Sequence, residues 1–334
     1  MKLVIITPIN ERCGVAEYSR LLKEQLETIS DIEVELLSYK KLSSIADLKS
    51  SLLHIQYVPG LFPDKELFRR TVMNYPNPIV ITAHHFDGFI ESLQAHVDRI
   101  IVHDKSYKHE PKITFLIQGC PIFNEIDQKE KRAFRKSFGI PYYAKVVCSY
   151  GFIMRWKRID FVLESFAPYL ALNRDLFIVM LHSFHEHDEE EGIRIEKELE
   201  RIIYDYNISG QCIINHTFLE KEVINKYIQA SDIGILFAFD KIGSHGSSAV
   251  MKEYISGRCP VIASDIPHYS DIEYGVAKVQ PGDMTSFIYN TLYFLYDADE
   301  LFFLKEAQKE NYDKYNYDEF AKKHIEIYNQ LLEK

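Results

Sequence analysis

Short apolar runs typical of buried strands alternate with amphipathic helical patterns, and this alternation occurs twice along the chain. In the first half, strands are expected at residues 3–7, 32–37, 52–57, 79–83, 99–103 and 113–118. From residue 145 the pattern starts again, with strands expected at residues 145–150, 176–181, 211–214, 233–236 and 260–263. Strands that alternate with helices favour a doubly wound parallel sheet. The sequence therefore predicts two α/β domains with a cleft between them.

The predicted domain boundaries follow this repetition. An N-terminal domain covers residues 1–140, a C-terminal domain covers residues 141–315, and a last helix falls within residues 316–334. Residues 134–143 contain a glycine and a proline, a composition typical of a linker. The length of 334 residues suits two domains of about 150 residues each.

Composition narrows the class of protein and its compartment. The 49 acidic and 39 basic residues give a net charge of −10, which argues against general nucleic-acid binding. No apolar run approaches the ~18–20 residues that span a bilayer, so membrane contact is expected to be peripheral at most. The five cysteines are scattered without paired spacing, which favours buried thiols in a reducing compartment. We expect a cytoplasmic protein, with a position at the inner face of a membrane as the alternative.

Residues 243–265 join a Gly/Ser-rich turn, a short helix and an apolar strand. Gly246, Ser247 and Ser248 form the turn that opens the helix, whose N-terminus suits a phosphate group. Glu253 lies in the second turn of the same helix. A phosphate site and a carboxylate near the end of an α/β sheet predict a nucleotide-sugar site.

This segment resembles the signature of the retaining glycosyltransferases of the GT-B fold, family 4 (glycosyl transferases group 1). In that family an acid and a Gly/Ser turn precede a second acid, eight positions on, and a strand that reads here Pro-Val-Ile-Ala-Ser. The resemblance implies that Glu253 binds the ribose hydroxyls of the nucleotide. His245 stands where the family has its first acid, which contacts the donor sugar, so the donor sugar and the activity stay open.

The resemblance also implies how the chain is organised. Two Rossmann-like domains are expected, with the acceptor on the side of residues 1–140 and the donor on the side of residues 141–315. The helix within residues 316–334 is expected to cross back to the N-terminal domain.

Two N-terminal loops carry further family motifs. The sequence Cys-Gly-Val-Ala-Glu-Tyr after the first strand is similar to a family loop, which implies that Gly14 lies near the donor. A glycine also permits close approach of the backbone to a diphosphate, although a plain turn is the alternative. His84 matches the family's Thr-x-His motif, in which the histidine approaches the donor sugar. The alternative for His84 is a histidine held by hydrogen bonds at a strand end.

Residues 149–160 combine a strand, a glycine turn and a basic segment. A departing diphosphate needs positive charge close by. The family pattern is Gly-Arg, four residues, then Lys-Gly. Gly151 and Lys157 match this pattern. Phe152 stands in place of its arginine, and Arg158 stands in place of its second glycine. The resemblance implies that Lys157 is catalytic, with a solvated surface lysine as the alternative, and Arg155 is the candidate substitute for the missing arginine.

The predicted function is retaining transfer of a hexose from a nucleotide sugar, with UDP- and GDP-sugars favoured, in polysaccharide or glycoconjugate biosynthesis. The acceptor is a glycan, a lipid-linked sugar or a protein. The spacing of His182, His185 and His187 suits neither a helical pair nor a strand face, which argues against a metal site there. The resemblance implies that no metal and no further cofactor are required, because GT-B enzymes lack the metal-binding acidic motif of the other large glycosyltransferase fold.

Three alternatives remain from the sequence. The first is a degenerate GT-B protein that binds a nucleotide sugar without transferring it, and the second is a GT-B nucleotide-sugar epimerase. The third, a dehydrogenase, is disfavoured because no G-x-G-x-x-G follows the first strand.

Overall fold

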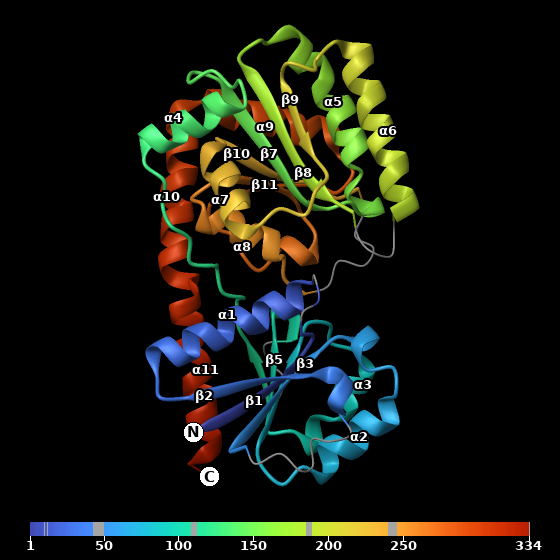
Figure 1. The fold of residues 1–334 in the computed structure, drawn as a ribbon, viewed down its shortest axis with the longest axis vertical. Helices are drawn as coiled ribbons and strands as arrows, with labels where there is room; N and C mark the ends of the chain where they lie inside the picture. Colours follow the sequence, from blue (N-terminus) through green and yellow to red (C-terminus); the bar gives the residue numbers. More distant parts are fainter. Residues whose placement is uncertain are drawn as a thin grey trace. The chain divides into compact units, whose positions relative to one another are not determined.

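The computed structural model describes residues 1–9, 11, 13–42, 50–107, 112–184, 189–239 and 246–333. The chain forms two compact units, and each contains one six-stranded sheet (Figure 1). The first unit consists of Met1–Pro121, His245–Ala249 and Tyr315–Lys334. The second consists of Ile122–Ser244 and Val250–Lys314. The predicted fold class, two Rossmann-like parallel-sheet domains, is confirmed.

The sheet of the first unit has the strand order β2-β1-β3-β4-β5-β6, and all its pairs are parallel. Its strands are β1 (Lys2–Thr7), β2 (Glu33–Ser38), β3 (Leu52–Tyr57), β4 (Ile79–Ala83), β5 (Arg99–Val102) and β6 (Ile113–Phe115). Successive side chains of a strand point to opposite faces, so Val4 and Ile6 enter one apolar cluster while Leu3 and Ile5 enter another. The sheet is therefore covered on both faces, as parallel sheets require.

Helices α2 (Lys65–Asn74) and α3 (Gly88–Ser92) contribute to the first of these clusters. Helices α1 (Gly14–Ile29) and α11 (Tyr317–Leu332) lie side by side and contribute to the second (Figure 1). Short 3₁₀ turns occur at Pro59–Leu61 (η2), Gln94–His96 (η3) and Lys105–Tyr107 (η4). The last helix thus packs against elements of the first unit that lie far from it in the sequence.

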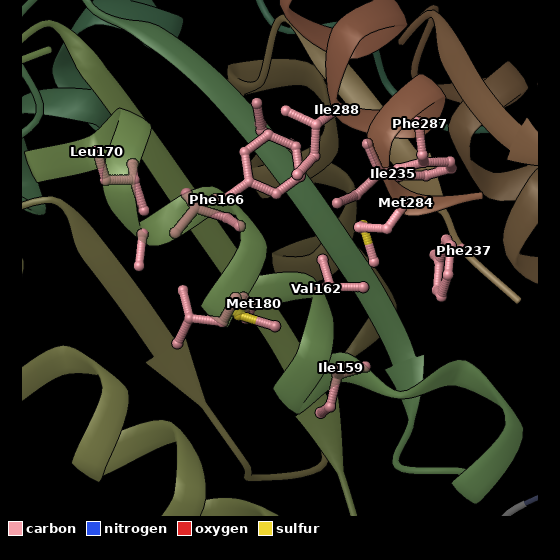
Figure 2. Packing of buried hydrophobic residues seen from close by; sticks show 14 of the residues in the cluster. Ile159, Val162, Phe166, Leu170, Met180, Ile235, Phe237, Met284, Phe287 and Ile288 are labelled. Atoms are coloured by element: carbon pink, nitrogen blue, oxygen red, sulfur yellow. The ribbon is translucent and has the colours of Figure 1, made fainter. Parts of the chain in front are cut away.

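The sheet of the second unit has the order β12-β11-β10-β7-β8-β9, again with parallel pairs only. Its strands are β7 (Lys145–Phe152), β8 (Leu176–Ser183), β9 (Cys212–Asn215), β10 (Ile233–Leu236), β11 (Val261–Ser264) and β12 (Val276–Val279). The helices are α4 (Gln128–Ser137), α5 (Ile159–Leu172), α6 (Glu189–Tyr206), α7 (Lys221–Ala230), α8 (Ala249–Ser256), α9 (Met284–Tyr296) and α10 (Ala298–Tyr315), with turns η5 (Arg155–Lys157) and η6 (Pro267–Tyr269). Figure 2 shows how side chains of α5 and α9 pack with those of β8 and β10 in the largest apolar cluster.

The boundary between the units differs from the expected one. Residues 134–137, taken as the start of a linker, belong to α4, which begins with a capping box between Asp127 and Glu130. Arg135 of this helix is buried, donates to the carbonyls of Ala230 and Ala144, and pairs with Asp232 at 2.8 Å. These bonds hold α4 in the second unit, so the chain leaves the first unit at Pro121. Strand β12 and helices α9 and α10 were not predicted.

Candidate functional site

Each sheet has one point at which the chain reverses the direction of strand addition. In the first unit it lies at β1, between β2 and β3, and in the second unit at β7, between β8 and β10. Ligands of open parallel sheets bind outside the carboxyl ends of the strands at such a point. The loops that follow β1 and β7, and the helix that follows β10, are therefore the first places to look for a site.

Gly151 lies near the end of β7, and Lys157 follows this strand, at the switch point of the second unit. Gly151 has φ +131°, and a Cβ atom at this position would lie 2.7 Å from Lys157 Nζ and 3.4 Å from Val250 Cγ2. The glycine thus makes room for the ammonium group. Lys157 Nζ donates to the carbonyl of Phe152 at 3.3 Å, which confines it to the end of the strand.

Burial lowers the pKa of Lys157 to about 8, because desolvation disfavours the charged ammonium. Within the part of the chain that the structure describes, Lys157 has no ion pair with a carboxylate. A partly desolvated cation without a counter-ion favours the binding of an anion, and a phosphate group would stabilise its charged form.

Arg158 and Arg155 flank this lysine. Arg158 has φ +42° and ψ +52°, the left-handed conformation, and it caps the start of α5. This geometry explains why the family pattern has glycine at this position. Arg158 Nε donates to Asp160 at 3.1 Å, whereas Arg155 is exposed on η5.

Glu253 lies on α8 and is 3% exposed. Its carboxylate forms an ion pair with Lys221 at the start of α7, while Oε2 is buried and has no hydrogen-bond partner. Burial raises the pKa of the Tyr150 hydroxyl, and the nearby Glu253 carboxylate raises it further. A buried acceptor without a donor costs about 1–3 kcal/mol, so a ligand hydroxyl that donates to Oε2 would be favoured.

Lys221 is a residue that the sequence analysis missed. It belongs to a different helix and lies 32 residues before Glu253, and no motif connects the two. Its ion pair balances the buried charge of Glu253 when no ligand is bound.

The turn before α8 belongs to the first unit. Gly246 has φ +82°, and a Cβ there would lie 2.7 Å from the carbonyl oxygen of His84. Both the conformation and this close approach require glycine. Ser248 is buried directly before the first residue of α8, and Ser247 is partly buried. His245 lies outside the described residues.

His84 follows β4, and its ring Nε2 lies 2.8 Å from Gln56 Oε1. Burial lowers the pKa of His84 to about 3, and nearby His103 lowers it further, so the ring is neutral at physiological pH. The edge of the Tyr18 ring contacts it, with centroids 4.9 Å apart. Gly14 is the first residue of α1; it is exposed, and a Cβ there would contact nothing within 4 Å.

The predicted residues thus fall into separate groups: Gly151 with Lys157, Glu253 with a lysine that was not predicted, and Gly246 with His84. Among the described residues, no three His, Cys, Asp or Glu side chains are grouped so as to hold a metal ion. His182 is buried against Ser149 at 2.8 Å, and the two other histidines of that stretch lie outside the described residues. No described helix is long and apolar enough to cross a membrane.

The chain has the GT-B fold, in which two Rossmann-like domains follow one another. HepE from Anabaena in complex with UDP-glucose is similar over 100% of this chain and 98% of its own, with a TM-score of 0.74 and 11% identity. Sucrose-phosphate synthase from Thermosynechococcus elongatus matches over 99% and 98%, with a TM-score of 0.73 and 14% identity. A glycosyltransferase from Rickettsia africae matches over 99% and 98%, with a TM-score of 0.74 and 13% identity. No protein-family model matches the sequence, and no curated protein does.

Proposed function

We propose that this protein is a GT-B glycosyltransferase that moves a sugar from a nucleoside-diphosphate sugar to a hydroxyl acceptor, with retention of the anomeric configuration. UDP-sugars are the favoured donors, because HepE of the same fold binds UDP-glucose. The retaining outcome rests on the resemblance of residues 243–265 to family 4. The nucleotide binds the second unit, which extends over most of the predicted donor domain.

The observation that carries the proposal is the buried, unpaired Oε2 of Glu253. A ribose offers two neighbouring hydroxyl donors, and a carboxylate is the acceptor that bonds them most strongly. Glu253 is thus the ribose contact, with Lys221 keeping its other oxygen in place. Ser247, Ser248 and Gly246 lie at the N-terminal end of the same helix, where a phosphate is stabilised by backbone N–H groups.

Lys157 acts on the leaving group. As the bond between the sugar C1 and the diphosphate oxygen breaks, negative charge grows on the diphosphate, and an ammonium in a desolvated position stabilises that charge. The acceptor oxygen forms the new bond to C1, and its proton leaves with the diphosphate or to water. Arg155 is exposed beside Lys157 and is the second candidate cation.

The acceptor is a glycan, a lipid-linked sugar or a protein, and the reaction belongs to polysaccharide or glycoconjugate biosynthesis. We place it in the cytoplasm, with peripheral membrane contact at most. The five cysteines are free, in keeping with a reducing compartment. His245 is the candidate contact for the donor sugar in place of the family's acid.

The test is incubation of the purified protein with UDP-glucose and, separately, GDP-glucose, without added metal, alone and with a panel of sugar acceptors. Release of the nucleoside diphosphate together with a new glycoside that keeps the α-configuration by NMR is the expected result. Binding of a nucleotide sugar without release of the nucleoside diphosphate would indicate a degenerate GT-B protein. Conversion of the sugar to another sugar while it stays attached to the nucleotide would indicate an epimerase. Failure of both nucleotides to bind would overturn the proposal.

A further inference from the structure

A chain of hydrogen bonds runs through the interior of the first unit, from the last helix of the protein to His84. Tyr328 Oη of α11 lies 2.7 Å from His54 Nδ1, and His54 Nε2 lies 2.7 Å from Thr82 Oγ1. Gln56 Nε2 lies 3.4 Å from His54 Nε2, and Gln56 Oε1 lies 2.8 Å from His84 Nε2. Tyr328, His54, Gln56 and Thr82 are fully buried.

The strands explain why these groups share one face of the sheet. His54 and Gln56 are two residues apart on β3, so their side chains point to the same side. Gln56 pairs with Thr82 in the register of β3 and β4, and His84 follows two residues later. Helices α1 and α11 contribute to the cluster on this face, and Tyr328 comes from α11.

The chain of bonds has a direction. An amide nitrogen can only donate, so Gln56 Nε2 requires a bare Nε2 on His54. The proton of neutral His54 then sits on Nδ1 and is donated to Tyr328 Oη, while Thr82 donates to Nε2. At the other end, Gln56 Oε1 can only accept, so the proton of His84 sits on Nε2 and its Nδ1 carries a lone pair.

His84 Nδ1 has no hydrogen-bond partner among the described residues, and the ring is partly exposed. A bare ring nitrogen accepts a hydrogen bond, and a sugar hydroxyl is a donor of the right kind. The opposite tautomer would present an N–H, which donates to a hydroxyl oxygen, so the tautomer sets the direction of the hydrogen bond to the sugar.

We propose that Tyr328 is a positioning residue that fixes, through His54 and Gln56, the tautomer in which His84 Nδ1 accepts a hydrogen bond from a sugar hydroxyl. The hydrogen bond from a sugar hydroxyl rests on the proposed function. The relay, by which we mean the chain of hydrogen bonds from Tyr328 through His54 and Gln56 to His84, does not. Without the Tyr328 hydroxyl, His54 Nδ1–H would be buried and unpaired. His54 would then move its proton to Nε2, and the Gln56 amide would turn over.

The relay is tested by ¹⁵N NMR of histidine-labelled protein, because the shift of a ring nitrogen reports whether it carries a proton. A His84→Gln variant assigns the signals. The expected result is a bare Nδ1 on His84 in the wild type and a mixed or reversed tautomer in Tyr328→Phe. Tyr317→Phe is the matched control, since Tyr317 is a buried tyrosine of the same helix outside the hydrogen-bond chain, and it should leave His84 unchanged.

A second variant keeps the test decisive if Tyr328→Phe fails to fold. Gln56→Glu retains an acceptor for His84 Nε2 but removes the donor to His54, so His84 should keep its proton on Nε2 and its pKa should rise. With UDP-glucose as the probe, Tyr328→Phe should lower kcat/KM about tenfold, the effect of one weakened hydrogen bond, and leave UDP affinity unchanged.

The outcomes separate the two proposals. An identical His84 tautomer in the wild type and Tyr328→Phe would overturn the relay, even if UDP-glucose is turned over. A tautomer that responds to Tyr328→Phe, in a protein that binds neither UDP-glucose nor GDP-glucose, would support the relay and overturn the proposed function.

Discussion

The two units have sheets of the same size and parallel pairing, yet the polar groups at their strand ends differ in charge. The second unit presents Lys157 and the Glu253–Lys221 ion pair, which are charged or partly charged. The first unit presents His84 at the end of a chain of neutral side chains. Lys157 follows the carboxyl end of β7 and His84 that of β4, the end of the strands at which a doubly wound sheet places its ligands.

Under the proposed function, the charged groups of the second unit suit the nucleotide part of the donor, and the neutral His84 of the first unit suits its sugar. A diphosphate carries charge that grows in the transition state, and a cation in a desolvated position stabilises it. A sugar carries only hydroxyls, which a neutral acceptor of fixed orientation recognises without a charge to desolvate. The comparison predicts that changes in the second unit alter nucleotide affinity and leaving-group departure, whereas changes at His84 alter recognition of the sugar.

Lys157→Ala should have the largest effect. Loss of the ammonium that we propose stabilises the departing diphosphate is expected to lower kcat with UDP-glucose roughly 10²-fold. Steady-state release of UDP measures this. The control is Lys145→Ala, which removes a lysine from the opposite end of the same strand and should leave kcat near normal. A variant at Lys157 with unimpaired turnover would remove this residue from the mechanism.

The next effect concerns the ribose. A hydrogen bond to a charged acceptor contributes about 1.5–3 kcal/mol, so 2′-deoxy-UDP should bind the wild type roughly 10- to 100-fold more weakly than UDP. In Glu253→Ala the two nucleotides should bind alike, because the acceptor is gone. Calorimetric titration measures both affinities. His84→Ala serves as the control from the first unit and should keep the full preference for UDP over 2′-deoxy-UDP. If Glu253→Ala kept the same preference as the wild type, Glu253 would be excluded as the ribose contact.

The pH dependence of UDP affinity separates the units further. The pKa of Lys157 is lowered to about 8, so the free protein loses this charge as the pH rises through that value. UDP affinity should therefore fall by up to about tenfold per pH unit above pH 8 and be flat between about pH 7 and pH 8, where the terminal phosphate of UDP is already ionised. The pKa of His84 is about 3, so His84 adds no change between pH 5 and pH 8. Affinities measured from pH 6 to pH 9.5 test this, and Lys157→Met should abolish the fall.

The same shift acts on stability with a defined sign. Because burial lowers the pKa of Lys157 in the folded protein, the unfolded chain binds more protons between about pH 8 and the ordinary lysine value. The contribution of Lys157 to the free energy of unfolding therefore increases as the pH rises through that window. Over this pH range, therefore, the stability of the free protein should rise while its affinity for UDP falls.

Much of the fold was predictable, because the strand patterns are local. The runs at residues 3–7, 52–57 and 79–83 coincide with β1, β3 and β4 to within one residue. The boundary at residue 140 was not, because Arg135 is held by Ala230 and Asp232, which lie 95 and 97 residues further on. The capping box at Asp127 and Glu130 was the local signal for a helix, which extends to Ser137 and so into the expected linker at residues 134–143.

The candidate site was predictable only where glycine or a motif marked it. Gly151 and Gly246 both have positive φ and close neighbours, which the motif reflects. Lys221 and Tyr328 carry no motif; they reach Glu253 and His54 only through tertiary packing, from 32 and 274 residues away. Pairings across such separations are set by the fold and cannot be derived from one sequence.

The smallest effect compares two positions with positive φ, one in each unit. Gly246 in the first unit has φ +82°, and Arg158 in the second unit has φ +42°. The left-handed conformation costs a residue with a Cβ about 1–2 kcal/mol, and glycine avoids this but loses more chain entropy on folding. Arg158→Gly should therefore be more stable than Arg158→Ala by about 1 kcal/mol in urea unfolding. Both variants lose the bond to Asp160 and the contacts of the guanidinium with Phe161 and Phe239, so the difference isolates the backbone. Equal stability of the two variants would show that the loop before α5 relaxes to accommodate a Cβ, and that the family's glycine at this position is not required by backbone strain.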